Sequence, residues 1–216
     1  MPSLKIIELR QTLAEKFPHS RVPLNRPAGS TWVTGLPQID GLPRGALTEL
    51  IAGQKSTGSA TVIRALMKRA AHEQRIIAYV DGNDSLDVTQ IEGGTLARLL
   101  WVRTRSAEAA LKALDLILRD QNLGFIIVDL AFNLISQLRR ISPTAWYRFQ
   151  RLVENTEVLC AVVTPYRMVI PAELHIELQS RFSLLALEAE QEKVLMAIKT
   201  GSAETECLEK AAQQFA

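Results

Sequence analysis

The sequence predicts an α/β domain whose mostly parallel β-sheet is covered by helices on both faces. Apolar stretches of strand length alternate along the chain with helical patterns, as in sheets whose parallel strands are connected through helices. The 216 residues, 47% of them hydrophobic and 22% charged, are enough for one domain with a substantial core. The expected strands are Leu47–Ala52, Ile76–Asp81, Leu99–Arg103, Leu123–Asp129 and Val158–Thr164.

Helical patterns fill the gaps between these strands. A helix is expected to begin at Ser59, soon after the first strand. Ser85–Arg98 is predicted to be helical, with an interruption at Gly93-Gly94. Ser106–Asp120 has a serine as its N-cap and apolar residues at helical spacing, and Ser142–Glu154 is the next helix.

The N-terminal region is predicted to be set apart from this core. Residues 1–30 are expected to form a helical arm, with an amphipathic helix at Ser3–Phe17 and then a linker rich in proline and glycine. Such an arm suits either contact with a second copy of the chain or packing against its own domain. Trp32–Ala46 is rich in turn residues and leads into the first strand.

The C-terminal region departs from the alternating pattern. The core, residues 31–200, is expected to end in a β-hairpin that turns at Glu190–Glu192. Its two strands are predicted at Phe182–Glu188 and Val194–Thr200. Residues 201–216 form a polar tail.

Composition and residue spacing exclude several classes of protein. The formal net charge of +2 allows nucleic-acid contact but does not demand it. No apolar run approaches the ~20 residues that span a bilayer and no signal-peptide pattern is present, so we expect a cytoplasmic protein without a membrane partner. Cys160 and Cys207 lie in no spaced His/Cys cluster, which predicts neither a metal site nor a disulfide framework. His19, His72 and His175 accompany no nucleophile elbow, so nucleophilic catalysis has no support.

The stretch Leu47–Thr61 contains the spacing of a phosphate-binding loop, G-x-x-x-x-G-K-[ST], beginning at Gly53 and with its second glycine at Gly58. In such a loop, backbone N–H groups and a helix N-terminus hold phosphate oxygens, the lysine neutralises phosphate charge and the hydroxyl holds Mg²⁺. Here the lysine position is Ser59 and the hydroxyl position is Ala60. The spacing is therefore retained without the charge or the metal ligand.

Two neighbouring residues are candidates to replace these groups. Lys55 lies inside the loop and could reach a phosphate from an unusual direction, while Thr61 is one residue late. One residue rotates a helical side chain by about 100°, so Thr61 should point away from a metal site. We interpret the loop as a relic connection between strand and helix, and we expect neither ATP nor Mg²⁺ as a cofactor.

Two carboxylates end the predicted strands beside this loop. The apolar run that ends in Asp129 is typical of a Walker-B strand, whose acid binds Mg²⁺ through water. Asp81 ends the neighbouring strand in the same way. Buried strands often end in an acid, so we interpret both residues as vestiges of an ancestral nucleotide site.

Over roughly residues 32–164 the chain resembles the RecA family of strand-exchange ATPases. The resemblance rests on TGLPQIDGLPRGALTELIAG, GQKSTGSAT, IAYVDGNDSLD and FIIVDLAFNL. It implies a RecA-like core and places Asn83 where RecA proteins have the glutamate that activates water. The lysine, the metal-binding hydroxyl and the catalytic glutamate are thus all replaced, at Ser59, Ala60 and Asn83. The resemblance therefore implies a pseudo-ATPase and not an enzyme. The DNA-binding loops and the C-terminal domain of RecA have no counterpart of comparable size, so strand exchange is not expected.

Within that superfamily the chain looks most like the ImuA group, accessory proteins of the bacterial damage-inducible (SOS) mutagenesis cassette. The carrying features are the LPRGALTEL lead-in, an arginine-containing helix after the fourth strand and a terminal hairpin near Arg181-Phe182. The resemblance implies a role in translesion DNA synthesis and DNA repair. It also implies three partners: an ImuB-like polymerase-related protein, an error-prone replicative-type polymerase and RecA.

A group of arginines is the other candidate for a binding surface. Arg139, Arg140, Arg148 and Arg151 gather around the helix Ser142–Glu154, with Trp146, Tyr147 and Phe149 interleaved. Such a surface suits DNA phosphates or an acidic partner segment. We favour a solvated arginine face with the aromatic rings packed inward.

Two other functions remain open from the sequence. One is an atypical ATPase of the RecA/KaiC type that uses Lys55, Asp81 and Asp129. The other is a recombination regulator that binds RecA filaments or DNA without hydrolysis.

Overall fold

The structure is a computed structural model that describes residues 30–202, apart from residues 55, 121, 155, 184–185 and 187–189. The fold given below is that of one compact unit that begins at Thr31, in its described residues. The expected arm in residues 1–29, Lys55 and nearly all of the expected tail lie outside the described residues.

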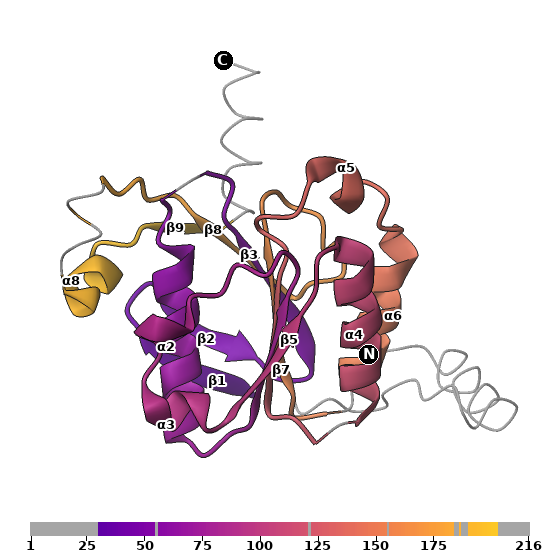
Figure 1. The fold of residues 1–216 in the computed structure, drawn as a ribbon, viewed down its shortest axis with the longest axis horizontal. Coiled ribbons are helices and arrows are strands. Elements are labelled where there is room, and N and C mark those ends of the chain that lie inside the picture. The colour runs from indigo at the N-terminus through magenta and orange to yellow at the C-terminus, as the bar shows by residue number, and fades with distance from the viewer. Residues whose placement is uncertain are drawn as a thin grey trace, which may run out of the picture. The chain divides into compact units, whose positions relative to one another are not determined.

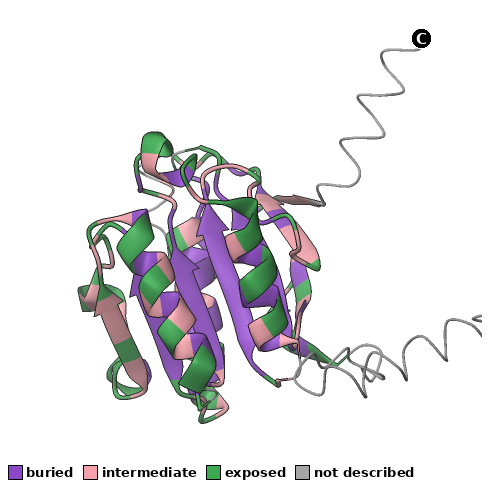
Figure 2. Ribbon diagram, turned by 90° about the vertical axis from the view of Figure 1, so that its right-hand side faces the viewer, coloured by how far each residue is buried: buried purple, intermediate pink, exposed green. Residues whose placement is uncertain are grey.

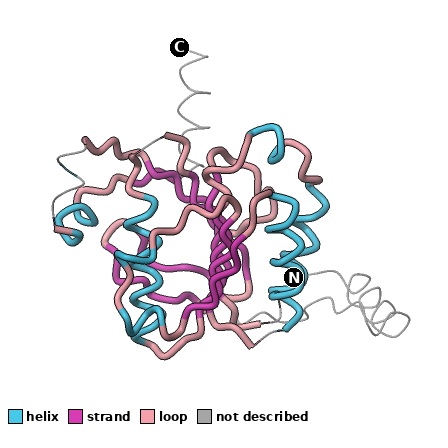
Figure 3. The backbone as a smooth tube through the Cα atoms, viewed as in Figure 1, coloured by secondary structure: helices cyan, strands magenta, loops and turns pink. Residues whose placement is uncertain are grey.

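A seven-stranded sheet forms the centre of the domain, with strand order β5-β4-β6-β7-β3-β8-β9. All of its neighbouring pairs are parallel except β8 and β9. The α/β sheet flanked by helices that the sequence predicts is confirmed (Figures 1 and 3). The strands are β3 (Ala46–Ile51), β4 (Ile77–Asp81), β5 (Leu99–Arg103), β6 (Phe125–Asp129), β7 (Leu159–Thr164), β8 (Leu174–Leu178) and β9 (Thr200–Ser202).

Helices cover the two faces of the sheet separately (Figure 1). On one face lie α2 (Ser59–His72), α3 (Gly93–Leu96) and α8 (Gln191–Met196), and on the other lie α4 (Ala107–Asp120) and α6 (Pro143–Val153). The short helix α5 (Ile135–Leu138) follows β6 at the carboxyl end of the sheet. The four central strands β3, β4, β6 and β7 are buried along their whole length, which the continuous purple of the sheet in Figure 2 shows.

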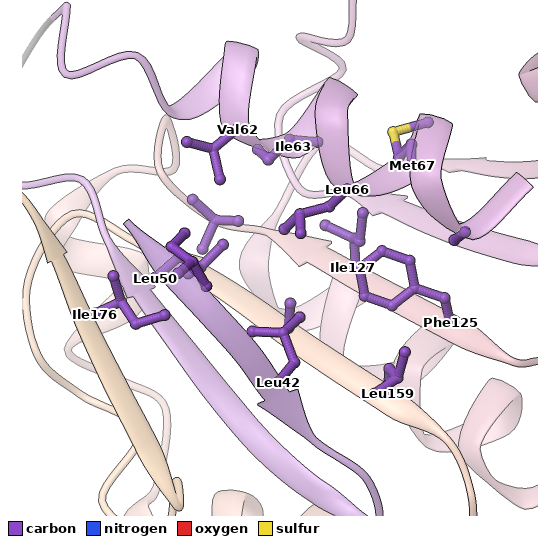
Figure 4. Close-up of a cluster of buried hydrophobic side chains, with 14 of the residues drawn as sticks. Leu42, Leu50, Val62, Ile63, Leu66, Met67, Phe125, Ile127, Leu159 and Ile176 are labelled. Carbon is purple, nitrogen blue, oxygen red and sulfur yellow. The ribbon is translucent and has the colours of Figure 1, made fainter. Parts of the chain in front are cut away.

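Two apolar cores hold these layers together. On the α2 face, Val62, Leu66 and Met67 pack against strand residues such as Phe125 and Ile127 (Figure 4). On the opposite face, α4 contributes buried apolar residues at spacings of three and four, as the sequence predicts for Ser106–Asp120. The Ser106 hydroxyl accepts a hydrogen bond from the N–H of Ala109 and so caps this helix.

The lead-in Trp32–Ala46 differs from the sequence prediction. It forms a β-hairpin of β1 (Thr31–Leu36) and β2 (Ile39–Pro43), where only turn-rich chain was expected. Its inward residues alternate along β1, and Trp32 stacks at 5.6 Å from the Phe125 ring and donates a hydrogen bond to Glu73. The glycines and prolines of this stretch concealed the alternating pattern.

The predicted helix Ser85–Arg98 is also corrected. The structure has only the 3₁₀ turn η1 (Val88–Gln90) and the four-residue α3, which begins at Gly93 instead of being interrupted there. The carboxylate of Asp81 binds the N–H groups of Ser85 and Leu86, and that arrangement takes this stretch out of helical geometry.

The expected C-terminal hairpin lies at other residues. An antiparallel pair does end the sheet, but β8 and β9 form it. The predicted strand Val194–Thr200 is wrong: residues 194–196 end helix α8, and only Thr200 lies in a strand, β9. Val194 and Ile198, four residues apart, are both buried. No helix in the described part of the chain has both the length and the apolar character needed to cross a membrane.

A buried glutamate ties β3 to β7 and β8. The Glu49 carboxylate on β3 is fully buried, and its Oε1 accepts hydrogen bonds from Thr164 Oγ1 (2.9 Å), Met168 N (2.8 Å) and Val169 N (3.1 Å). Its Oε2 lies 2.8 Å from Nδ1 of His175 on β8. This one side chain therefore fixes the chain that leaves the carboxyl end of β7.

We predict that Glu49→Ala lowers the free energy of unfolding by about 3–5 kcal/mol, because it leaves four donors or ion-pair partners without an acceptor inside the protein. Glu49→Gln keeps one acceptor oxygen for the hydroxyl and backbone donors and should cost distinctly less. Urea unfolding of both variants tests this. Equal losses for the two variants would contradict the assignment of these hydrogen bonds to the carboxylate.

Candidate functional site

The loop between β3 and α2 has the shape of a phosphate-binding turn. Ser56 and Gly58 both have positive φ angles, 61° and 85°, and Gly58 is the N-cap of α2. Ser59 and Ala60 are the first two residues of this helix. The helix N-terminus is thus present, while neither side chain carries the charge of a lysine and Ala60 offers no oxygen to a metal ion.

A hollow of about 470 Å³ lies beside the first turn of α2. Ser59 and Ala60 line it together with Tyr79, Asp129 and Phe132. The structure therefore brings the predicted loop residues and the acid at the end of β6 to one place. Thr61 is buried, with 4% of its surface exposed.

Asp129 is already engaged by a tyrosine that the sequence analysis missed. Tyr79 lies on the neighbouring strand β4, and its hydroxyl donates a hydrogen bond of 2.6 Å to Asp129 Oδ2. Asp129 Oδ1 accepts a second hydrogen bond from the N–H of Ala131. Burial raises the pKa of Asp129 above its usual range, against the opposing effect of the Tyr79 hydrogen bond. Burial likewise raises the pKa of Tyr79, so its hydroxyl remains a donor.

Asp81 serves as the brace of the loop that follows β4. Its fully buried carboxylate accepts hydrogen bonds from the N–H groups of Ser85 and Leu86, at 2.8 Å each, and of Asn83, at 3.3 Å. The indole Nε1 of Trp101 on β5 lies 3.3 Å from Asp81 Oδ2. Asn83, the position where the RecA resemblance places a glutamate, is exposed to solvent.

The segment after β8 packs against the loop from the other side. The N–H of Phe182 donates a hydrogen bond of 2.9 Å to the carbonyl of Ser56. A side chain at Gly58 would place its Cβ 3.0 Å from the Phe182 ring and 3.3 Å from Ile198. The loop is therefore part of an apolar contact with the C-terminal segment, and the sequence offered no local signal for it.

The four arginines are all exposed, and the structure brings only some of them together. Arg140, beyond α5, and Arg148, on α6, line the same hollow of about 690 Å³, while Arg139 and Arg151 do not. Arg148 Nε lies 3.2 Å from Asp115 Oδ1 on α4. Of the interleaved aromatic residues, Trp146 and Phe149 are buried and Tyr147 is 48% exposed.

The remaining titratable groups make no further site in the described part of the chain. His175 is paired with Glu49, as described above. No group of three or more histidines, cysteines and acids stands ready to hold a metal ion among the described residues. Burial raises the pKa of the Cys160 thiol to about 12, as suits a small core residue.

Comparison with known proteins agrees with this geometry. The chain is 24% identical over 148 residues to Protein RecA of Ectopseudomonas oleovorans, which covers 61% of this chain and 42% of that protein. It is 33% identical over 108 residues to Protein RecA of Marinobacter nauticus, which covers 48% of this chain and 31% of that protein. The chain thus spans well under half the length of these relatives. The model of the RecA N-terminal domain matches residues 21–139, and the chain belongs to that family.

Proposed function

We propose that the chain is a non-catalytic RecA-like accessory protein of damage-inducible translesion DNA synthesis, which acts in the cytoplasm through protein contacts. One observation supports the non-catalytic role. The two carboxylates at the strand ends, Asp81 and Asp129, already accept hydrogen bonds from donors within the chain. Asp129 is held by Tyr79 and Ala131, and Asp81 by the backbone of the loop after β4.

Mg²⁺-ATP lacks its usual side-chain partners in this loop, although Arg64 lines the hollow beside it. A triphosphate needs positive charge near its terminal phosphates, and Ser59 supplies none. Mg²⁺ needs oxygen ligands in octahedral geometry, and Ala60 supplies none. An Asp129 whose pKa is raised by burial and whose carboxylate already accepts a hydrogen bond from Tyr79 is a poor ligand for a cation or its water shell.

The two alternatives make different demands on the site. An atypical ATPase would need Lys55, Asp81 and Asp129 to contact one nucleotide. The Asp81 carboxylate instead accepts hydrogen bonds from the backbone of the loop after β4. A regulator that binds DNA or RecA filaments without hydrolysis draws support from the exposed arginines Arg139, Arg140, Arg148 and Arg151.

The proposed partners follow from the ImuA-group resemblance. They are an ImuB-like polymerase-related protein and an error-prone replicative-type polymerase, with RecA as a further contact. Membership of the RecA N-terminal domain family and the occupied acids are consistent with a RecA-like scaffold that now serves for binding.

We predict that the full chain forms a complex with the polymerase-related protein in the absence of any nucleotide. Size-exclusion chromatography with light scattering on purified proteins measures the complex directly. Wild-type and Lys55→Ala chains should behave alike, with or without ATP and Mg²⁺. A complex that forms only with ATP would support the ATPase alternative, and no complex at all would contradict the proposed role.

We predict that Asp129→Asn is more stable than the wild type at neutral pH. Because burial raises the pKa of Asp129, the wild type loses stability as the pH rises above the ordinary value of 3.8, until the folded-state pKa is passed. An amide in this place keeps partners in Tyr79 and Ala131 without a buried charge. The gain should grow as the pH rises above the ordinary value, because only the wild type must then either hold its proton or bury a charge.

Urea unfolding between about pH 2 and pH 8, which covers the titration of both a raised and a lowered carboxyl pKa, measures this effect. Asp115→Asn is the matched control, because the hydrogen bond from Arg119 lowers the pKa of Asp115 and its effect has the opposite sign. That variant should lose stability relative to the wild type as the pH rises. An Asp129→Asn variant that weakens with rising pH would mean that Asp129 is a stabilised anion, available to a cation.

A further inference from the structure

The face of the sheet opposite the phosphate loop carries a second hollow, larger than the one beside α2. It has a volume of about 690 Å³ and lies between α4 and α6, which run side by side on this face (Figure 2), and it reaches the α5–α6 connection. We name it the α4/α6 groove. Its lining includes Leu111, Leu116, Arg140, Ile141, Arg148 and Phe149.

The groove offers apolar surface to an incoming chain. Leu116 on α4 is 70% exposed, an unusual state for a large aliphatic side chain beside a hollow. Leu111, five residues earlier on α4, and Ile141, after α5, are both partly buried in the second core, and Phe149 is fully buried. An apolar side chain placed here would lose water contact on several sides.

The rim of the groove has more positive than negative charge. Lys112 pairs with Glu108 at 2.7 Å, while Asp115 is shared between Arg119 at 2.9 Å and Arg148 at 3.2 Å. The Arg140 side chain has no carboxylate partner among the described residues. In the described part of the chain, Asp115 is the single carboxylate partner of both Arg119 and Arg148, and Arg140 adds a further positive charge. The surplus of positive charge would be neutralised by an acidic partner.

We propose that the α4/α6 groove binds an acidic amphipathic helix of a partner protein. Apolar residues on one face of that helix enter beside Leu116 and Ile141, and its carboxylates pair with Arg140 and Arg148. This inference rests on the proposed function, in which the chain acts through protein contacts, and it supplies the chemistry of the partner. A third helix laid between two packed helices is a common mode of peptide recognition.

The same surface suits nucleic acid less well. Single-stranded nucleic acid is held by exposed aromatic rings beside a basic track, whereas Trp146 and Phe149 are buried here. Glu108 and Asp115 line the groove, and hydrogen bonds from Lys112 and Arg119 hold the pKa of each carboxyl below its usual range. Both acids are paired with cations of the chain itself and do not distinguish an acidic helix from a phosphate backbone, so the preference for a helix rests on the apolar lining and the buried aromatic rings.

The test uses a display library of randomised 16-residue helical peptides, a length of roughly four turns, selected against the full wild-type chain. We expect the recovered peptides to be acidic and amphipathic. Fluorescence anisotropy of the synthesised peptides should show binding at least tenfold weaker to Arg140→Glu and to Leu116→Asp. Both changes are at exposed positions, so the variants should keep the fold, which circular dichroism checks.

Two control variants match these changes on the other face of the sheet. Lys68→Glu on α2 reverses a charge whose side chain is 62% exposed, and Met196→Asp on α8 replaces an apolar residue that is 68% exposed. Neither should change peptide binding. If the library yields no binder, or binders that ignore both groove substitutions, the proposal is overturned.

A labelled oligonucleotide separates the remaining possibility. If the oligonucleotide binds the wild type, competes with the peptides and no longer binds Arg140→Glu, the groove is a nucleic-acid site and the proposal is wrong. The peptide measurement does not require the polymerase-related protein. Failure of that protein to bind would therefore count against the proposed function, whereas indifference of the peptides to the groove variants would count against the groove alone.

Discussion

Three buried carboxylates constrain the carboxyl end of the sheet, because a buried carboxylate must be neutral or surrounded by donors. Glu49 on β3, Asp81 on β4 and Asp129 on β6 lie on three strands of the same sheet. The loops and side chains of the domain itself supply the hydrogen-bond donors that these carboxylates need. These hydrogen bonds fix the chain after β7 and β4, and so determine the walls around the phosphate-type loop.

On the proposed non-catalytic function, the same constraint explains how a RecA-like fold remains stable without a bound nucleotide. Once Tyr79 and the backbone after β4 satisfy the two strand-end acids, a metal ion is not needed to neutralise them. The loop itself gains a structural use, since Gly58 lies against Phe182 and Ile198. These contacts stabilise the loop geometry without a ligand, while the proposed binding groove lies on the opposite face.

Much of the architecture could be predicted from the sequence, because strands buried on both faces consist of continuous runs of apolar residues. The strand Leu99–Arg103 matches β5 at both ends, and the helix Ser106–Asp120 differs from α4 only by its capping serine. The strand β8 was missed because its sequence, LHIEL, is partly polar. Helix α8 was predicted as a strand because its six residues are too few to show a helical period. Contacts between distant residues, such as Tyr79 with Asp129, leave no local pattern to read.

The measurement that most directly tests this account is calorimetric titration of the full chain with ATP and with ADP, each with and without Mg²⁺. The account predicts no heat of binding at millimolar nucleotide under any of these conditions, because Ser59 and Ala60 supply neither charge nor metal ligand and Asp129 is held by Tyr79. Saturable binding that requires Mg²⁺ and disappears in Lys55→Ala would contradict it. The chain would then be an ATP-binding protein with a displaced lysine.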